Sequence, residues 1–219
     1  NSIDYSDIEV NIEKTSNDTY LKNDKLKNSI KNDFSLLNSF ISYNSYTDDT
    51  SVSLEVAAYE DLTKDKKSDK FEFILPYFSI SKLIPTEFDG ELNFDTTGAL
   101  QQKNTNVTEK YFINDLSYDS NNFISKLGTR SNINLTYKNV SKEGENSPTY
   151  RDKLKNDNFF ITNFNTSLPF KKVGNTYNSY FTPKLLLKYS PFDSENLKDL
   201  DRSLNENNIF SNNRLGVQD

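Results

Sequence analysis

The alternation of apolar and polar side chains between Phe88 and Asp95 constrains the fold more than any other feature of the sequence. The even positions are Phe88, Gly90, Leu92 and Phe94, and the odd positions are Asp89, Glu91, Asn93 and Asp95. Successive side chains of a β-strand point to opposite faces, so this segment forms a strand with one apolar and one polar face. A helix would mix the two sets. The fold then depends on what covers the apolar face, which is a second sheet in a soluble sandwich and lipid in a transmembrane barrel.

The same alternation recurs along the chain and predicts an all-β fold. The expected strands span residues 3–13, 34–47, 51–60, 71–84, 88–100, 106–118, 123–138, 158–170 and 176–190. These segments are longer than the average globular strand of about 5–6 residues. They reach the roughly 9–11 residues that a tilted membrane strand needs. Their length therefore favours a membrane barrel over a sandwich.

Turn and breaker residues divide these strands. The Asp48–Asp49 pair predicts a tight turn, and Gly174–Asn175 predicts a second one. The apolar phase of the strand at 71–84 switches near Pro76, which predicts a β-bulge because proline cannot donate to the ladder. Residues 61–70 are expected to form a charged connector. Polar loops are expected at about 14–33, 139–157 and 191–216, with a short helix possible in the segment 195–205.

Composition excludes several classes of function. The chain has no Cys and no His, which removes disulfides, thiol nucleophiles, imidazole bases and the usual zinc sites. Its formal net charge is −6 and no basic patch stands out, so we expect no nucleic-acid partner. No apolar run approaches the roughly 20 residues of a membrane-spanning helix. We assign no catalytic residue, no cofactor and no metal site from the sequence.

Aromatic residues argue against disorder in this polar chain. Hydrophobic residues make up only 34% of it, yet it contains 16 Phe and 13 Tyr. Disordered chains are poor in aromatics. Low hydropathy with many aromatics is typical of a transmembrane barrel, because half of each strand faces water.

The polar positions of the strands are the candidate functional residues. We expect them to face the lumen of a barrel, where they would meet sugar or a plug protein: Glu9, Glu55, Asp89, Glu91, Asn93, Asp95, Lys184 and Lys188. The alternative is the solvated outer face of a soluble sheet. Paired carboxylates also serve as the acid and base of glycosidases, but nothing in the sequence marks a pocket for them.

The C-terminal part of the chain resembles one family. Residues 182–191 read TPKLLLKYSP, Asp201–Arg202 follow, and residues 207–216 read NNIFSNNRLG. This order is similar to the pattern T-P-K-L-x-L-R-Y-S-P, D-R and N-I-F-S-x-N-R-L-G of the lipopolysaccharide-assembly outer-membrane proteins, the LptD family. Weaker similarity extends to residues 13–21, 59–62 and 71–76. The loop residues that carry the pattern are Asp201, Arg202, Asn208, Ile209, Phe210, Asn213, Arg214 and Gly216.

The resemblance implies a transporter of the Gram-negative cell outer membrane, without catalytic residues or cofactor. Its fold would be an antiparallel meander of long strands that forms part of a large transmembrane β-barrel. Members of the family close around a plug lipoprotein, LptE, and receive lipopolysaccharide from periplasmic bridge proteins. The lipid tails enter the membrane through a lateral opening, and the sugar enters the lumen. Residues 1–219 would form one partial barrel domain made of its middle strands, without the periplasmic jelly-roll or the closing strands.

Two other functions stay open at this point. The chain could belong to another outer-membrane barrel, such as a porin or receptor, which the pattern at 182–216 argues against. It could also be a secreted β-sandwich adhesin. A sandwich would stay soluble without detergent, because its apolar faces cover each other.

Overall fold

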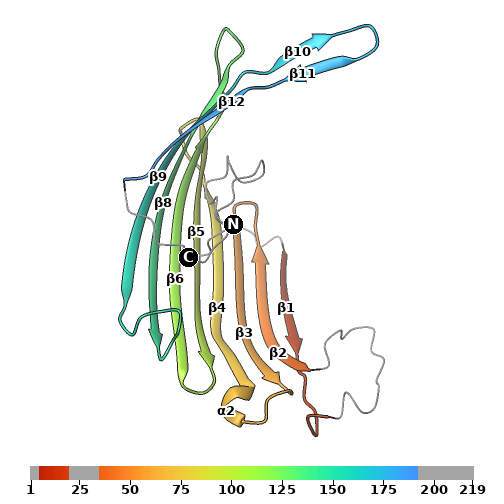
Figure 1. Cartoon of the computed structure of the whole chain (residues 1–219), viewed down its shortest axis with the longest axis vertical. Helices are drawn as coiled ribbons and strands as arrows, with labels where there is room; N and C mark the ends of the chain where they lie inside the picture. The colour runs from red at the N-terminus through yellow and green to blue at the C-terminus, as the bar shows by residue number, and fades with distance from the viewer. Residues whose placement is uncertain (1–4, 20–34, 192–219) are drawn as a thin grey trace. The chain divides into compact units, whose positions relative to one another are not determined.

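A computed structural model describes residues 5–19 and 35–191 of the chain, and these residues form antiparallel β-structure (Figure 1). The expected all-β class and antiparallel meander are confirmed. The elements are β1 (Tyr5–Asn11), β2 (Leu36–Tyr46), β3 (Thr50–Asp61), α2 (Lys67–Lys70), β4 (Phe71–Ile84), β5 (Gly90–Lys103), β6 (Val107–Ser120), β7 (Phe123–Ile124), β8 (Arg130–Glu145), β9 (Lys155–Ser167), β10 (Phe170–Val173), β11 (Asn178–Phe181) and β12 (Lys184–Tyr189).

Neighbours in the sequence are neighbours in the main sheet. Its ten strands follow the order β1-β2-β3-β4-β5-β6-β8-β9-β12, with the short β7 paired to β8. Strands β10 and β11 form a separate two-stranded sheet. Strands β4, β5 and β6 have 14 residues each and β8 has 16, well beyond the average globular strand of about 5–6 residues.

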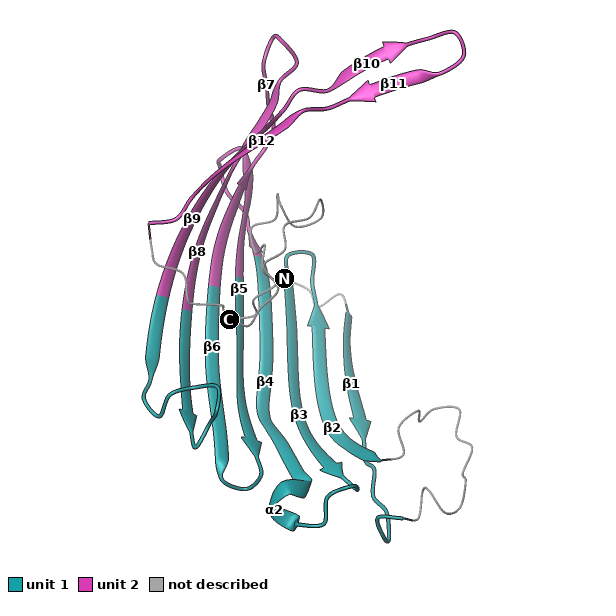
Figure 2. Ribbon diagram, viewed as in Figure 1, with its two compact units in different colours: residues 1–82, 95–114, 140–157 teal, residues 83–94, 115–139, 158–219 magenta. Residues whose placement is uncertain are grey.

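The chain divides into two compact units (Figure 2). Unit 1 comprises residues 1–82, 95–114 and 140–157, and unit 2 comprises residues 83–94, 115–139 and 158–219. Unit 1 therefore contains β1, β2, β3 and α2 complete. Unit 2 contains β7, β10, β11 and β12 complete.

The hairpin of β2 and β3 in unit 1 turns at the predicted Asp48–Asp49 pair. The backbone N–H of Thr47 donates to the carbonyl oxygen of Thr50 at 2.8 Å. The Asp49 carboxylate accepts hydrogen bonds from the hydroxyls of Thr47 and Thr50, each at 3.0 Å. Aspartate favours such turns because its short side chain satisfies nearby donors.

The predicted bulge at Pro76 is confirmed. Glu55 of β3 pairs with Tyr77 of β4, whereas Ala57 pairs with Ile74, so two residues of β4 stand opposite Val56. A bulge shifts the facing of a strand by one residue. It therefore keeps the odd-numbered Phe side chains before Pro76 and the even-numbered apolar side chains after it on one face.

The predicted strands at 158–170 and 176–190 are wrong in their extent. Strand β9 ends at Ser167, and β12 begins at Lys184. The chain between them forms the β10–β11 hairpin, which turns at the predicted Gly174–Asn175 through a 3.1 Å hydrogen bond from Gly174 N–H to Tyr177 C=O. Pro169 and Pro183 stand at the two breaks. Proline lacks the N–H that a continuous ladder requires, which explains the interruption.

The predicted strand at 123–138 and loop at 139–157 also need correction. Strand β8 begins at Arg130 and continues to Glu145, and β9 begins at Lys155, so the connection spans only residues 146–154. The polar composition of this segment suggested a loop. Its side chains instead pair across strands: Asn156 Nδ2 donates to Ser141 Oγ at 3.2 Å, and Lys110 lies 3.6 Å from Glu143.

Other predicted segments fall partly outside the described residues. These are most of the loop at 14–33, the loop at 191–216 and the short helix at 195–205. The charged connector at 61–70 is described, and its last residues form the one-turn helix α2.

Candidate functional site

One face of the unit 1 sheet is apolar. Partners in a ladder point to the same side of the sheet. One row across four strands joins Ile8, Tyr43, Leu54 and Phe78. The neighbouring row joins Val10, Ile41 and Val56. The apolar sets that the sequence predicted for separate strands therefore form one continuous surface in this unit.

This apolar face of unit 1 is exposed. Ile8 is 70% exposed, Ile41 58% and Val56 45%. These values are high for large aliphatic side chains, which are among those most often buried in soluble proteins. The face is covered by no second sheet within the described residues, where the only other sheet is the β10–β11 pair of unit 2.

The opposite, polar face of unit 1 contains more completely buried side chains. Ala57, which is 2% exposed, alternates with the exposed Val56 and lies on the polar face. Ser53 lies on the same face, where its hydroxyl donates to Asn44 Oδ1 at 2.7 Å. Along the rows that contain Ile41, Val56 and Ala57, large apolar side chains are exposed and small or polar ones are packed, which is the reverse of a soluble sheet.

Glu109 is the most buried carboxylate on the polar face of unit 1. It is 6% exposed, and its Oε2 accepts a hydrogen bond from Lys103 Nζ at 3.1 Å. The Ser147 hydroxyl donates to Glu109 Oε1 at 2.5 Å and accepts hydrogen bonds from the backbone N–H groups of Thr149 and Tyr150. Glu109 thus anchors the 146–154 connection to the β5–β6 hairpin.

The polar face of unit 2 contains a chain of amides and a carboxylate. Asn163 of β9 is 0% exposed and donates from Nδ2 to Asn134 Oδ1 at 2.9 Å. Asn134 of β8 donates in turn to the Asp119 carboxylate of β6. Lys138 and Asp115 form an ion pair at 3.4 Å between the same two strands, β8 and β6. Hydrogen bonds therefore link the amides and the carboxylate across β9, β8 and β6.

The apolar face of unit 2 is exposed like that of unit 1. Leu187 of β12 pairs with Phe164 of β9, and both point to the face opposite Asn163. Leu187 is 57% exposed and Phe164 is 37% exposed. Leu187 therefore does not enter a closed core.

The predicted polar residues that lie within strands are on the polar faces of their own units. In unit 1, Glu9 and Glu55 flank Ser42 in one ladder row, so the structure brings these two carboxylates to the same surface. Asp95 belongs to this unit and lies on β5. By alternation it shares a face with Thr97, whose hydroxyl lies 3.4 Å from the hydroxyl of Ser79.

In unit 2 the predicted residues lie in β5, in the turn before it and in β12. Glu91 and Asn93 lie near the start of β5, and Asp89 lies in the turn before it, where its carbonyl oxygen accepts a 2.8 Å hydrogen bond from the Tyr118 hydroxyl. Lys188 of β12 pairs with the buried Asn163, and Lys184 pairs with Ser167. The eight loop residues from Asp201 to Gly216 that carry the family pattern lie outside the described residues.

Sequence reasoning missed the residues that are packed most tightly. Glu109, Asn134 and Asn163 are absent from the predicted set. Asn134 carried a usable signal, because it alternates with Ile133 and Leu135. The burial of Glu109 depends on Ser147, which lies 38 residues further along the chain. Local periodicity contains no information on such a contact.

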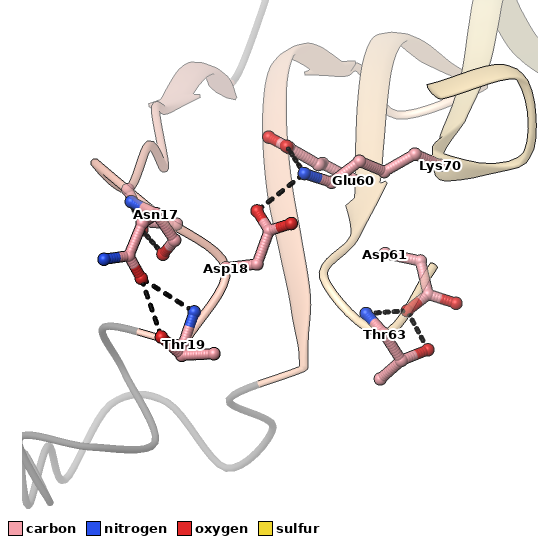
Figure 3. A network of polar contacts seen from close by, with 8 residues as sticks. Asn17, Asp18, Thr19, Glu60, Asp61, Thr63 and Lys70 are labelled. Atoms are coloured by element: carbon pink, nitrogen blue, oxygen red, sulfur yellow. Dashed lines mark hydrogen bonds and ion pairs between the residues drawn. The ribbon is translucent and has the colours of Figure 1, made fainter. Parts of the chain in front are cut away.

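A further ionic contact fastens the segment after β1 to the connector between β3 and β4 in unit 1 (Figure 3). The ammonium group of Lys70 lies 2.7 Å from Asp18 Oδ1 and 2.9 Å from Glu60 Oε1. The hydrogen bonds that Lys70 donates to Asp18 and, second, to Glu60 raise its pKa above the ordinary 10.5. In the same region Asp61 accepts two hydrogen bonds from Thr63, which closes the turn after β3.

No protein-family model matches the chain, and no curated protein matches it. Within residues 5–19 and 35–191 no helix has the length and apolar character to cross a membrane. The same residues contain no group of three or more acidic side chains arranged to hold a metal ion.

Proposed function

We propose that this chain forms part of the wall of a transmembrane β-barrel in the cell outer membrane. We further propose that the barrel inserts lipopolysaccharide into the outer leaflet. In this role the chain is a transporter without catalytic residues or cofactor. Its partners are lipopolysaccharide, the plug lipoprotein LptE and the periplasmic lipopolysaccharide-bridge proteins.

The observation that carries the proposal is the exposure of large apolar side chains on one face of the sheet within each unit. Transferring one Leu or Phe side chain out of water is worth roughly 1.5–3 kcal/mol. Large contiguous apolar patches are rare on soluble monomers and mark interaction or membrane surfaces. Lipid would cover Ile41 and Val56 of unit 1 and Leu187 of unit 2, which are all exposed. The long strands support the same conclusion, because they exceed the roughly 9–11 residues of a membrane strand.

The choice of lipopolysaccharide rests on the resemblance at residues 182–216 and on the chemistry of the polar faces. Carboxylates such as Glu9 and Glu55 and amides such as Asn93 are suited to hydrogen bonding with the hydroxyl groups of sugars. The polar faces also suit a lumen that encloses a plug protein. A porin would need the same polar lumen, so only the resemblance favours lipopolysaccharide over small solutes.

The membrane wall is tested by labelling β2 one residue at a time. The chain contains no Cys, so single cysteines can be introduced at positions 40 to 44 without first replacing native cysteines. We expect a fluorophore at Ile41 and Tyr43 to be quenched by lipid-borne nitroxide, and one at Phe40, Ser42 and Asn44 to be quenched by a water-soluble agent instead. Equal lipid quenching at all five positions would refute the membrane-wall assignment.

The cargo is tested by depleting the protein in the organism that makes it. Loss of a lipopolysaccharide inserter should reduce lipopolysaccharide at the cell surface, measured with a modifying enzyme added outside the cells. Loss of a porin should leave surface lipopolysaccharide unchanged and slow the uptake of small solutes. Unchanged surface lipopolysaccharide would therefore reject this cargo while leaving the membrane-wall assignment intact.

A further inference from the structure

The β10–β11 hairpin of unit 2 exposes aromatic side chains on both of its faces. Phe170 and Phe181 are cross-strand partners with stacked rings 6.2 Å apart. The next pair, Lys171 and Tyr180, points to the opposite face, and the ammonium group of Lys171 lies 5.7 Å from the centre of the Tyr180 ring. In the hairpin turn Tyr177 is 75% exposed. The hairpin thus lacks the one buried face that strands normally have.

The exposed aromatic side chains of this hairpin indicate that a partner covers it. A single two-stranded hairpin is at best marginally stable in water. In Figure 1 the ribbon of β10 and β11 extends beyond the ends of β9 and β12 within unit 2. Every residue of both hairpin strands is exposed. Tyrosine side chains in such a position are typical of membrane interfaces, where an apolar ring meets lipid and a polar tip meets water, and phenylalanine adds a wholly apolar ring.

The positive charge of the residues around the hairpin indicates that the partner is anionic. The chain as a whole has 32 acidic and 26 basic residues, yet residues 158–190 contain neither Asp nor Glu. The same stretch contains Lys171 and Lys172 in β10 and Lys184 and Lys188 in β12. A surface that combines exposed aromatic rings with lysines, and that lacks negative charge, is complementary to an anionic lipid surface.

We propose that the β10–β11 hairpin docks on the anionic, phosphate-bearing headgroups of a membrane surface. The Lys171 and Lys172 ammonium groups contact the lipid phosphates, and the rings of Tyr177, Tyr180 and Phe181 enter the headgroup layer. This assignment goes beyond the proposed transport function and does not require the strands of the main sheet to cross the membrane. Lipid phosphate suits this hairpin better than an acidic protein does, because tyrosine and phenylalanine rings on both faces fit a headgroup layer that surrounds the hairpin.

The test uses the full chain with one tryptophan in the hairpin. The chain contains no Trp, so Tyr177→Trp provides a single fluorescent reporter. The protein is held in zwitterionic detergent micelles, and phosphatidylglycerol or phosphatidylcholine is added to them. We expect the emission of the reporter to move to shorter wavelength with phosphatidylglycerol and not with phosphatidylcholine. Added salt should reverse the shift, because it screens exposed charges.

Paired substitutions give the matched control. Each lysine near an anionic surface contributes about fivefold in affinity, so Lys171→Gln with Lys172→Gln should weaken the response to phosphatidylglycerol by roughly 30-fold. The same change at the exposed Lys66 and Lys67 of unit 1 should leave the response unchanged. Arginine at positions 171 and 172 should preserve the response, which separates loss of charge from loss of the hairpin.

Three results would overturn the inference. An equal response to phosphatidylcholine, whose phosphate is balanced by a choline cation, would show that the net negative charge of the headgroup is not recognised. An unchanged response after the Lys171 and Lys172 substitutions would show that these side chains make no contact. An equal emission shift with polyglutamate would identify an acidic polypeptide as the partner. The tryptophan reports only on the surroundings of the hairpin, whereas the labelling of β2 tests the membrane wall. Failure of one proposal can therefore be told apart from failure of the other.

Discussion

At the scale of single residues, the turns of this protein depend on short polar side chains that satisfy local donors. Asp49 accepts hydrogen bonds from the hydroxyls of Thr50 and Thr47, and Asp61 does the same for Thr63. The hydrogen bond from Thr50, followed by that from Thr47, lowers the pKa of Asp49 below its ordinary 3.8. The sequence predicted the turn at Asp48–Asp49, but only the structure shows which aspartate is the acceptor.

The lowered pKa gives Asp49 a testable role in acid stability. The folded state favours the ionised carboxylate. Its contribution to the free energy of unfolding is therefore present above pH 3.8, and it is lost as the pH falls through the lowered pKa of the folded state. We expect Asp49→Asn to reduce the loss of stability between pH 4 and pH 2, measured as the urea midpoint. Asp48→Asn changes the same charge in the same turn without removing either hydroxyl contact, and it should follow the unsubstituted protein. Equal behaviour of the two variants would contradict the role of Asp49.

At the scale of elements, a segment rich in polar side chains can belong to a strand and need not form a loop. Strand β8 continues to Glu145 through a segment whose composition predicted a loop. The connection that remains, residues 146–154, is held by Glu109 through Ser147 and by a 2.8 Å backbone hydrogen bond from Gly144 to Arg151. Composition alone could not reveal this arrangement, because the partners come from β6 and from the connection itself.

Removing the charge of Glu109 should release the 146–154 connection. A hydrogen bond to a charged group contributes about 1.5–3 kcal/mol, and Glu109→Gln weakens those from Lys103 and Ser147 together. We expect faster amide hydrogen exchange in residues 144–154 of this variant. Glu143→Gln removes the exposed pair with Lys110, which contributes about 0–1 kcal/mol, and should leave that exchange unchanged. Faster exchange in both variants would point to a general loss of stability.

At the scale of the whole molecule, the decisive property is the exposure of apolar faces in both units. Leu54 lies on the apolar face of unit 1 in the middle of β3, between Tyr43 and Phe78 of the adjacent strands. The adjacent Glu55 lies on the polar face between Ser42 and Tyr77. These neighbours therefore offer a matched pair of positions, one toward the proposed lipid and one toward the proposed lumen.

Arginine at these two positions should have opposite effects on assembly. A basic residue on the lipid side of a barrel costs roughly 2–4 kcal/mol at the membrane midplane, whereas lumen positions tolerate charge. We expect Leu54→Arg to reduce the heat-resistant folded fraction in detergent, seen by gel mobility. Glu55→Arg should assemble normally. If both variants, or neither, lost the folded fraction, the assigned facing would be wrong.

The sequence by itself determined that the chain forms long strands with two unlike faces, because alternation is a local property that the β-backbone imposes. It also placed the Asp48–Asp49 turn, the Pro76 bulge and the Gly174–Asn175 turn. Only the tertiary structure decided which face is packed, since burial depends on neighbours that are distant in sequence. The same dependence explains why Glu109 and Asn163 became visible as buried polar residues only after the strands were placed side by side. Pairing across strands satisfies polar groups that appear exposed when each segment is considered alone.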